Sequence, residues 1–209
     1  WNTLQTVLTR SRRDSRGRIS IDDSKKLKGP GENAHPLTHL ERGVLAFASV
    51  TRERNWLEGL DDTTLLAELG VDRPASPWYD TTTPLPLGRT RDALRIDRSR
   101  LNRAIDRTGT TCAHLAARAI DADDFNLRVQ QSGSKAIVNW ELIISLAEAC
   151  WARAGDRPLL LVIDRQGGRS HYLDELHAAW PAASRQVLGE SQAESRYRLN
   201  MTGRGPIEI

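Results

Sequence analysis

The segment Pro158-Leu159-Leu160-Leu161-Val162-Ile163-Asp164 decides the fold of this 209-residue chain. Its five consecutive apolar residues are typical of a central strand that is covered on both faces. Open α/β sheets place their functional crevice beyond the carboxyl ends of such strands. Asp164 is therefore the first candidate for a functional residue.

Helices and strands alternate on both sides of this segment. A glycine turn at residues 167–168 leads to a helix over residues 173–180, and strands follow over 187–188, 197–201 and 207–209. Just upstream, an apolar stripe predicts a buried helix, and its members are Ile137, Trp140, Ile144, Ala147 and Trp151. This alternation predicts an α/β fold.

The first half of the chain gives a second set of elements. Helical spacing covers residues 2–9, and an apolar alternation predicts a strand at 18–21. One face of a further helix is marked by Leu37, Leu40, Val44 and Phe47. The remaining elements are a helix capped by Asp61 or Asp62, a long loop or insertion over 71–96, a helix over 97–107, and an ambiguous stretch over 110–120 that we favour as a strand.

Length and composition indicate one globular domain over residues 1–209, with 39% hydrophobic and 27% charged residues. No apolar run is long enough to span a membrane, and the start Trp1-Asn2-Thr3-Leu4-Gln5 lacks the layout of an export signal. We therefore expect a soluble, cytoplasmic protein. Because the sequence starts with Trp1 rather than Met and stops within an expected strand, we expect the domain to be incomplete at both ends.

Basic residues gather in two series that could meet a phosphate backbone, although the net charge is only +3. Within the first thirty residues only Asp14, Asp22 and Asp23 oppose the first series, which is Arg10, Arg12, Arg13, Arg16, Arg18, Lys25, Lys26 and Lys28. The second series is Arg89, Arg91, Arg95, Arg98, Arg100, Arg103 and Arg107. The alternative for both is a set of solvated loops and helix faces.

The neighbours of Asp164 suit a phosphate ligand. Arg165 and Arg169 supply positive charge, while Gly167 and Gly168 supply bare backbone. A phosphate could then approach a cation that the carboxylate holds. The alternative is that Asp164 only caps the next turn.

Lys135 is another candidate contact for an anion. The motif Ser132-Gly133-Ser134-Lys135 opens the predicted buried helix, whose free N–H groups could hold a negative charge. It lacks the spacing of a nucleotide-binding P-loop. Ordinary helix capping by Ser134 is the simpler explanation.

Several motifs resemble bacterial ribonuclease HII. Asp23-Ser24-Lys25-Lys26-Leu27 before an amphipathic helix looks like the corresponding loop of that family, and Val162-Ile163-Asp164 is similar to its second acidic strand. Poorly characterised ribonuclease HII-like proteins share further motifs, namely Leu40-Glu41-Arg42-Gly43-Val44-Leu45, Asp164-Arg165-Gln166-Gly167-Gly168-Arg169, and Glu190 followed by Ser195-Arg196-Tyr197. The resemblance covers most of the chain and implies a ribonuclease H-like mixed sheet flanked by helices.

The resemblance also implies an activity: hydrolysis of RNA in RNA–DNA hybrids by Mg²⁺ or Mn²⁺ ions held by carboxylates. Asp164 is the one catalytic and metal-binding residue that the family's motif carries over, and Glu190, after an expected strand, is a second candidate ligand in the same crevice. The family's Asp-Glu pair in a Gly-rich strand, and its last acidic residue, are not visible here. Since one carboxylate cannot hold two ions, we expect weak or no catalysis from this chain alone.

The same resemblance assigns contacts to the backbone of the hybrid, which is recognised by its shape and 2′-hydroxyls. These contacts are Lys25 and Lys26, and together with them we expect nucleic acid to be bound by Ser24, Arg165, Gly167, Gly168, Arg169 and Lys135. A solvated loop is the alternative for the lysines.

Three functions are therefore open. The first is a metal-dependent endoribonuclease of the ribonuclease H type, with nucleic acid as its partner and no membrane or protein partner indicated. The second is a non-catalytic nucleic-acid-binding module with the same fold. The third is a structural or interaction domain whose basic stretches are only solvated surface.

Overall fold

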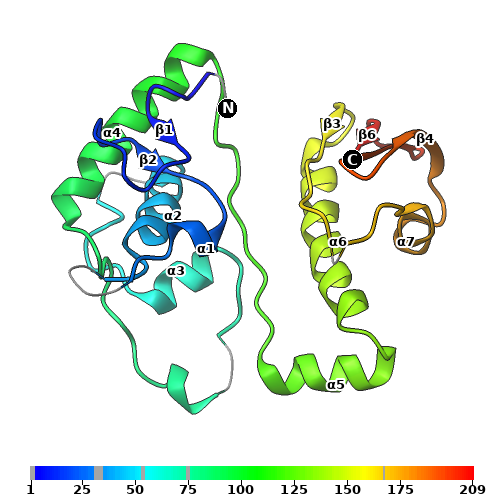
Figure 1. Cartoon of the computed structure of the whole chain (residues 1–209), viewed down its shortest axis with the longest axis horizontal. Coiled ribbons are helices and arrows are strands. Elements are labelled where there is room, and N and C mark those ends of the chain that lie inside the picture. The colour runs from blue at the N-terminus through cyan, green and yellow to red at the C-terminus, as the bar shows by residue number, and fades with distance from the viewer. Residues whose placement is uncertain (1–2, 31–34, 53–54, 74–75, 167) are drawn as a thin grey trace. The chain divides into compact units, whose positions relative to one another are not determined.

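The chain is a mixed α/β protein, seen in a computed structural model that describes residues 3–30, 35–52, 55–73, 76–166 and 168–209 (Figure 1). The sequence predicts one domain. The contacts group the chain into two compact units, residues 1–119 (unit 1) and 120–209 (unit 2), and each is described by itself.

Unit 1 is mostly helical. Its helices are α1 (Ser24–Leu27), α2 (Thr38–Val50), α3 (Asp62–Glu68), the 3-10 helix η1 (Pro77–Tyr79) and α4 (Arg91–Thr108). Strands β1 (Leu8–Thr9) and β2 (Ile19–Ser20) pair in parallel. Helix α2 packs on α4 and β2 and joins two apolar clusters, because Ala46 belongs to one and Leu45 to the other.

Helix α2 forms where the sequence predicts it, but the predicted face is buried only in part: Leu40 and Phe47 are half-buried, and Phe47 packs against one of the two clusters. Leu37 and Val44 are exposed, whereas Arg42, Leu45, Ala46 and Ser49 are buried at helical spacing. The physical reason is that Arg42 is neutralised. Its guanidinium pairs with the buried Asp97 of α4, so a charged residue occupies the inner face of α2.

Two further predictions for unit 1 are wrong. Residues 3–7 form turns and lead into β1, so the helix expected over 2–9 is not present among the described residues. Residues 110–119 form no strand, because the described backbone hydrogen bond in this stretch, from Ala117 N to Leu69 O (3.0 Å), does not continue into a ladder. The predicted strand at 18–21 and the helix capped by Asp61 are confirmed.

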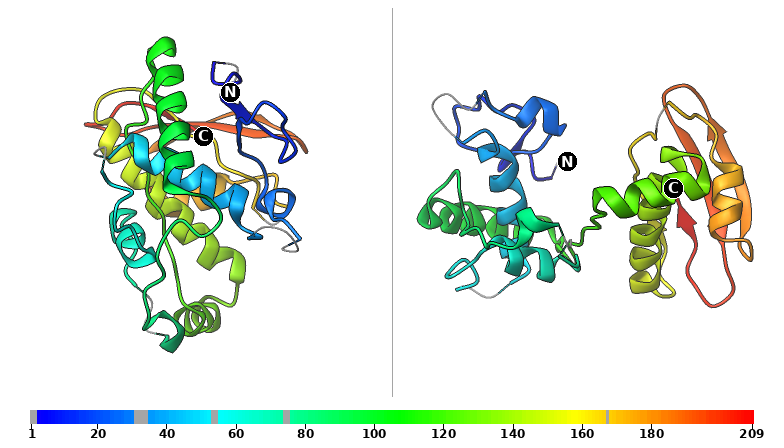
Figure 2. Two further views of the ribbon diagram at one scale, coloured as in Figure 1. Left: turned by 90° about the vertical axis from the view of Figure 1, so that its left-hand side faces the viewer. Right: turned by 90° about the horizontal axis from the view of Figure 1, so that it is seen from below.

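Unit 2 packs helices on a mixed sheet. Its helices are α5 (Ala122–Ser132), α6 (Lys135–Ala154) and α7 (Leu173–Ala179), and its strands are β3 (Leu159–Leu160), β4 (Ser184–Glu190), β5 (Ser195–Asn200) and β6 (Ile207–Glu208). The strand order is β3-β6-β5-β4, with β3 parallel to β6 and the other pairs antiparallel. Figure 2 shows α6 and α7 beside these strands.

The core of unit 2 lies between one face of this sheet and the helices α6 and α7. Trp151 of α6 meets Trp180, just after α7, edge to face with ring centroids 5.4 Å apart. Tyr197 and Leu199 of β5 are buried in the same cluster, while the alternate residues of β5 are exposed. Helices therefore cover one face of β5 and solvent covers the other, rather than helices flanking the sheet on both sides.

The prediction of a central strand at Leu159–Ile163 is wrong. Only Leu159–Leu160 is a strand, and it lies at the edge of the sheet, with Leu160 70% and Val162 89% exposed. Leu159 and Leu161 direct their N–H groups to Pro206 and Glu208. Leu159 and Leu161 pack against the core of unit 2, whereas Leu160 and Val162 face solvent, so only one side of the apolar run is covered.

Candidate functional site

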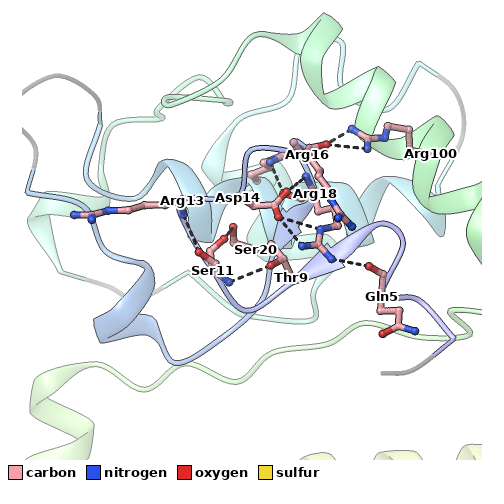
Figure 3. Close-up of polar contacts among 11 residues, drawn as sticks. Gln5, Thr9, Ser11, Arg13, Asp14, Arg16, Arg18, Ser20 and Arg100 are labelled. Atoms are coloured by element: carbon pink, nitrogen blue, oxygen red, sulfur yellow. Dashed lines mark hydrogen bonds and ion pairs between the residues drawn. The ribbon is translucent and has the colours of Figure 1, made fainter.

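The loop between β1 and β2 is held by several side-chain hydrogen bonds. Asp14 accepts bonds from the backbone N (2.9 Å), Nε (3.0 Å) and Nη2 (2.6 Å) of Arg18, as Figure 3 shows. This fork lowers the pKa of Asp14 from 3.8 to about 2, chiefly through the side-chain hydrogen bond with Arg18. Ser20 Oγ donates to Ser11 O (3.0 Å) across the loop. The loop is therefore held in one shape.

Three arginines fasten this loop to the helices around it. Arg42 of α2 donates to Gly17 O (2.7 Å) and Arg18 O (2.9 Å). Arg100 of α4 donates to Gly17 O (3.0 Å) and Arg16 O (3.4 Å), and Figure 3 shows it reaching the loop from α4. Arg12 donates to Lys28 O at the end of α1 (2.8 Å). The loop thus bridges α1 and α4.

Basic residues lie on the loop and on the two helices that it contacts, and we call this set the basic face: Arg13 and Arg16 on the loop, Lys25 and Lys28 at α1, and Arg100, Arg103 and Arg107 on α4. The three α4 residues lie at i, i+3 and i+7, so they share the side of the helix that meets the loop. All of these side chains except the half-buried Arg100 are exposed. Unit 1 carries 20 Lys and Arg against 15 Asp and Glu, whereas unit 2 carries 10 against 12.

The predicted contacts Ser24, Lys25 and Lys26 are the exposed residues of α1, and of these Lys25 belongs to the basic face. Asp23 caps the helix by accepting from Lys25 N (2.7 Å), and Lys26 Nζ pairs with Asp22 (3.3 Å). In the described structure Lys25 makes no ion pair, so its charge is available to an anion.

Asp164 lies at a pocket of about 350 Å³ in unit 2, where the carboxyl ends of β3 and β6 meet. Its Oδ1 accepts the N–H of Arg165 (2.9 Å). Both residues are exposed. The pocket's apolar wall is made by Trp140, Leu160, Leu161, Val162, Tyr172 and Ile209.

The predicted neighbours of Asp164 differ in whether they have ion-pair partners. Arg169 lines the same pocket but pairs with Glu175 (2.7 Å). Arg165 makes no ion pair among the described residues. Gly168 is exposed and has a φ of 82°, which a glycine adopts readily. Gly167 lies outside the described residues.

Glu190 does not share this pocket's lining. Its Oε1 accepts the hydroxyl of the buried Tyr197, and its Oε2 lies 2.8 Å from His171 Nδ1. The bond from Tyr197, followed by that from His171, lowers the pKa of Glu190. Burial, followed by the bond to Glu190, raises the pKa of Tyr197 to about 12. The network fastens β4 and β5 to the start of α7, since Tyr172 N also donates to Tyr197 Oη (2.9 Å).

Lys135 is exposed at the first turn of α6. Ser134 is the N-cap residue, but its side chain makes no capping bond, and Ser132 Oγ instead lies 3.3 Å from Ser134 O. The lysine belongs to neither the pocket lining nor the basic face.

The donor set does not fit the two-ion site that the resemblance implies. Both oxygens of Glu190 have hydrogen-bond partners, and the acids that line the pocket with Asp164 are Glu194 and Glu208, which pair with Arg196 (3.5 Å) and Arg198. Across the described ranges no group of three or more His, Cys, Asp or Glu side chains is arranged to hold a metal ion.

Comparisons with protein-family models, with curated proteins and with solved structures found no match to this chain. Within the described ranges, every helix is too short or too polar to cross a membrane.

Sequence patterns did not reveal two features of these surfaces. One is the stacking of Trp140 on Tyr172, with ring centroids 5.5 Å apart, because these residues are distant in sequence and both also suit an ordinary core. The other is the hydrogen bond from Tyr197 to Glu190. Both residues belong to a motif quoted above, but the motif does not indicate that they are in contact.

Proposed function

We propose that this chain binds nucleic acid through the basic face of unit 1. The observation that carries the proposal is the fastening of the β1–β2 loop by Arg100, which joins Arg16 of the loop to the arginine stripe of α4. Exposed Lys and Arg side chains bind phosphates and displace the counterions around them. This release of counterions supplies most of the affinity in non-specific binding of a protein to nucleic acid.

Preorganisation supports the proposal. Flexible basic tails must be ordered when they bind, at a cost in entropy, whereas the Asp14–Arg18 fork and the Arg42 bonds hold this loop before any ligand arrives. The local acids also leave the face basic: Asp14 and Asp22 are taken up by Arg18 and Lys26, and Asp97 by Arg42.

The test is the salt dependence of binding to a labelled RNA–DNA hybrid. Each phosphate contact contributes about 0.9 to the slope of log K against log salt concentration. We expect the triple variant Arg16→Gln, Arg103→Gln, Arg107→Gln to lower that slope by about 2–3 and to weaken binding. These three side chains are exposed, so the variant should keep the fold.

Arg157→Gln is the matched control, because Arg157 is an exposed arginine of unit 2 outside the basic face. Its slope should equal that of the unaltered chain. Equal slopes for the triple variant and the unaltered chain, or binding that does not depend on salt, would remove the proposal and favour an interaction domain with solvated basic loops.

Cleavage of the hybrid is a second candidate function. A ribonuclease H-like fold and a cytoplasmic location are proposed together with it. The observation in its favour is the place of Asp164, which lies where the carboxyl ends of two parallel strands meet at a pocket. Bound Mg²⁺ or Mn²⁺ would supply the activated water. Because the described acids do not complete such a site, binding is the stronger proposal.

Incubation of the hybrid with Mg²⁺ or Mn²⁺ separates the two functions. If the chain is a nuclease, we expect Asp164→Asn to abolish metal-dependent cleavage and Asp174→Asn, an exposed acid of α7, to leave it unchanged. Salt-dependent binding with no cleavage in either metal would identify the chain as a binding module.

A further inference from the structure

The outer edge of strand β3 is apolar and open to solvent. Among the described strands β6 is the only one that pairs with β3, and Leu159 and Leu161 donate their N–H groups to carbonyl oxygens on that side at 2.9 and 2.7 Å. The backbone groups of successive residues in an extended chain point in opposite directions. Those of Leu160 and Val162 therefore point away from β6, to the open edge.

The extended form continues past the two residues of β3. Leu160 and Val162 are 70% and 89% exposed, whereas Leu159 and Leu161 pack on the core of unit 2. This alternation is that of a strand with one face in solvent. The edge available for pairing therefore includes both Leu160 and Val162.

The two edges of this sheet differ in how they are protected. Proteins keep open edges from pairing by means of charges, prolines and β-bulges. The β4 edge carries Arg185 and Glu190 and has a bulge between Val187 and Gly189. The β3 edge has only Pro158 before it, and residues 159–163 are all apolar. An apolar edge with so little protection indicates a partner that supplies an extended chain with apolar side chains.

Strand β3 matches a second copy of itself in an antiparallel register centred on Leu161. In this register Leu160 of one copy lies opposite Val162 of the other, and Leu161 lies opposite Leu161. Because Leu160 and Val162 direct their backbone groups to the open edge, they form the hydrogen-bonded pairs of the new ladder. Leu159 lies opposite Ile163, so each pair from 159 to 163 is apolar.

Neighbouring two-fold registers fit less well. Centring the pair on Val162 sets Leu160 opposite the carboxylate of Asp164. Centring it on Leu160 sets Val162 opposite Pro158, which has no N–H to donate to the ladder. The sequence of the edge therefore selects the register centred on Leu161.

We infer that the chain forms a two-fold dimer in which β3 pairs antiparallel with β3 of a second copy and joins the two sheets of unit 2 into one. The inference goes beyond the proposed function and uses none of the residues of the basic face. Pairing covers the β3 edge of both copies, so assembly stops at two chains. Pairing of β3 with the β4 edge of another copy would instead set the apolar run against Arg185 and Glu190, and it would leave free edges from which a polymer grows.

Sedimentation velocity of the full chain tests the inference over about 1 to 100 μM, since interfaces of this small size give weak complexes. We expect a reversible monomer–dimer equilibrium in that range. Val162→Lys brings like charges together across the two-fold axis and should weaken the dimer by about tenfold or more. Val187→Lys is the matched control, because it makes the same change at an exposed valine of β4, and it should leave the equilibrium unchanged.

Disulfide cross-linking tests the register. In a chain that carries Cys112→Ser and Cys150→Ser, the variants Leu160→Cys and Val162→Cys are mixed and oxidised. The two positions form a hydrogen-bonded pair with Cα atoms about 5.5 Å apart, a distance that a disulfide spans. We expect the mixture to give covalent dimer and each variant alone to give severalfold less, because each position lies farther from its own copy across the axis. Both side chains are exposed, so neither change disturbs the core.

Several results would overturn the inference: a chain that stays monomeric at the highest concentration, a dimer that Val162→Lys does not weaken, or polymers that lengthen with concentration. Cross-linking as strong in the single variants as in their mixture would overturn the register. The proposed function fails separately. A monomeric chain that binds the hybrid through the basic face would keep that proposal and remove the dimer, whereas a dimer that does not bind the hybrid would do the reverse.

Discussion

Arg42→Met is expected to destabilise unit 1 by about 3–5 kcal/mol, because it leaves Asp97 buried without its main partner. Arg42 Nε and Nη2 each donate to Asp97 at 2.6 Å, and the two side chains are only 8% and 3% exposed. Arg89 stays 3.8 Å from Asp97, too far to replace this bidentate pair. Urea unfolding followed by circular dichroism measures the loss.

The double variant Arg42→Met, Asp97→Leu is expected to recover part of that loss, because no unpaired charge stays buried. Recovery should be incomplete, since Gly17 O and Arg18 O still lose their donor. Arg95→Ala is the surface comparison: Arg95 pairs with Glu58 and Asp92 while 46% exposed, and its loss should cost under about 1 kcal/mol. An equally small loss for Arg42→Met would mean that the buried pair does not hold unit 1 together.

The same pair explains why the inner face of α2 could not be predicted. Apolar spacing favours Leu37, Leu40, Val44 and Phe47, and a charged residue counts against a buried face. Arg42 is buried because Asp97, 55 positions later, meets it. Local periodicity carries no information about such a distant partner, so it predicted the helix correctly and its buried face only in part.

The prediction of a central strand from the apolar run at 159–163 was wrong for a related reason. A run without polar residues indicates a strand with no wet face, but it does not say which neighbours cover that strand. In the structure β3 has β6 on one side only, and Val162 is exposed. The position of Asp164 beyond this strand, at the pocket, did follow from the sequence, while its catalytic role stays a prediction.

Helix α5 shows the opposite case, because the sequence carries a signal for each of its ends. Asp121 accepts from Asp124 N (2.8 Å) as the N-cap, and Gly133 ends the helix with a φ of 71°. Both residues are standard boundary signals that bracket the eleven residues of α5. The helix has no buried residue, so it lacks the apolar stripe that indicates α2 and α6.

Trp151→Ala is expected to destabilise unit 2 by about 3–5 kcal/mol, the usual cost of truncating a buried aromatic residue. Trp151 is fully buried at the centre of the cluster that joins α6, α7 and the sheet. Truncation removes its edge-to-face contact with Trp180, its bond to Gly205 O and the guanidinium of Arg204 stacked 5.2 Å from its ring. Trp151→Phe keeps the aromatic contact and should cost clearly less.

Because the buried clusters of the two units share no residue, each variant should act on its own unit. Hydrogen exchange resolved by residue is the measurement: Trp151→Ala should speed exchange in α6 and β5 and leave α2 and α4 protected, while Arg42→Met should do the reverse. Leu127→Ala, at a 52% exposed position of α5, is the control and should change stability by no more than about 0.5 kcal/mol. Loss of protection in all four elements with either variant would show that the two units unfold as one.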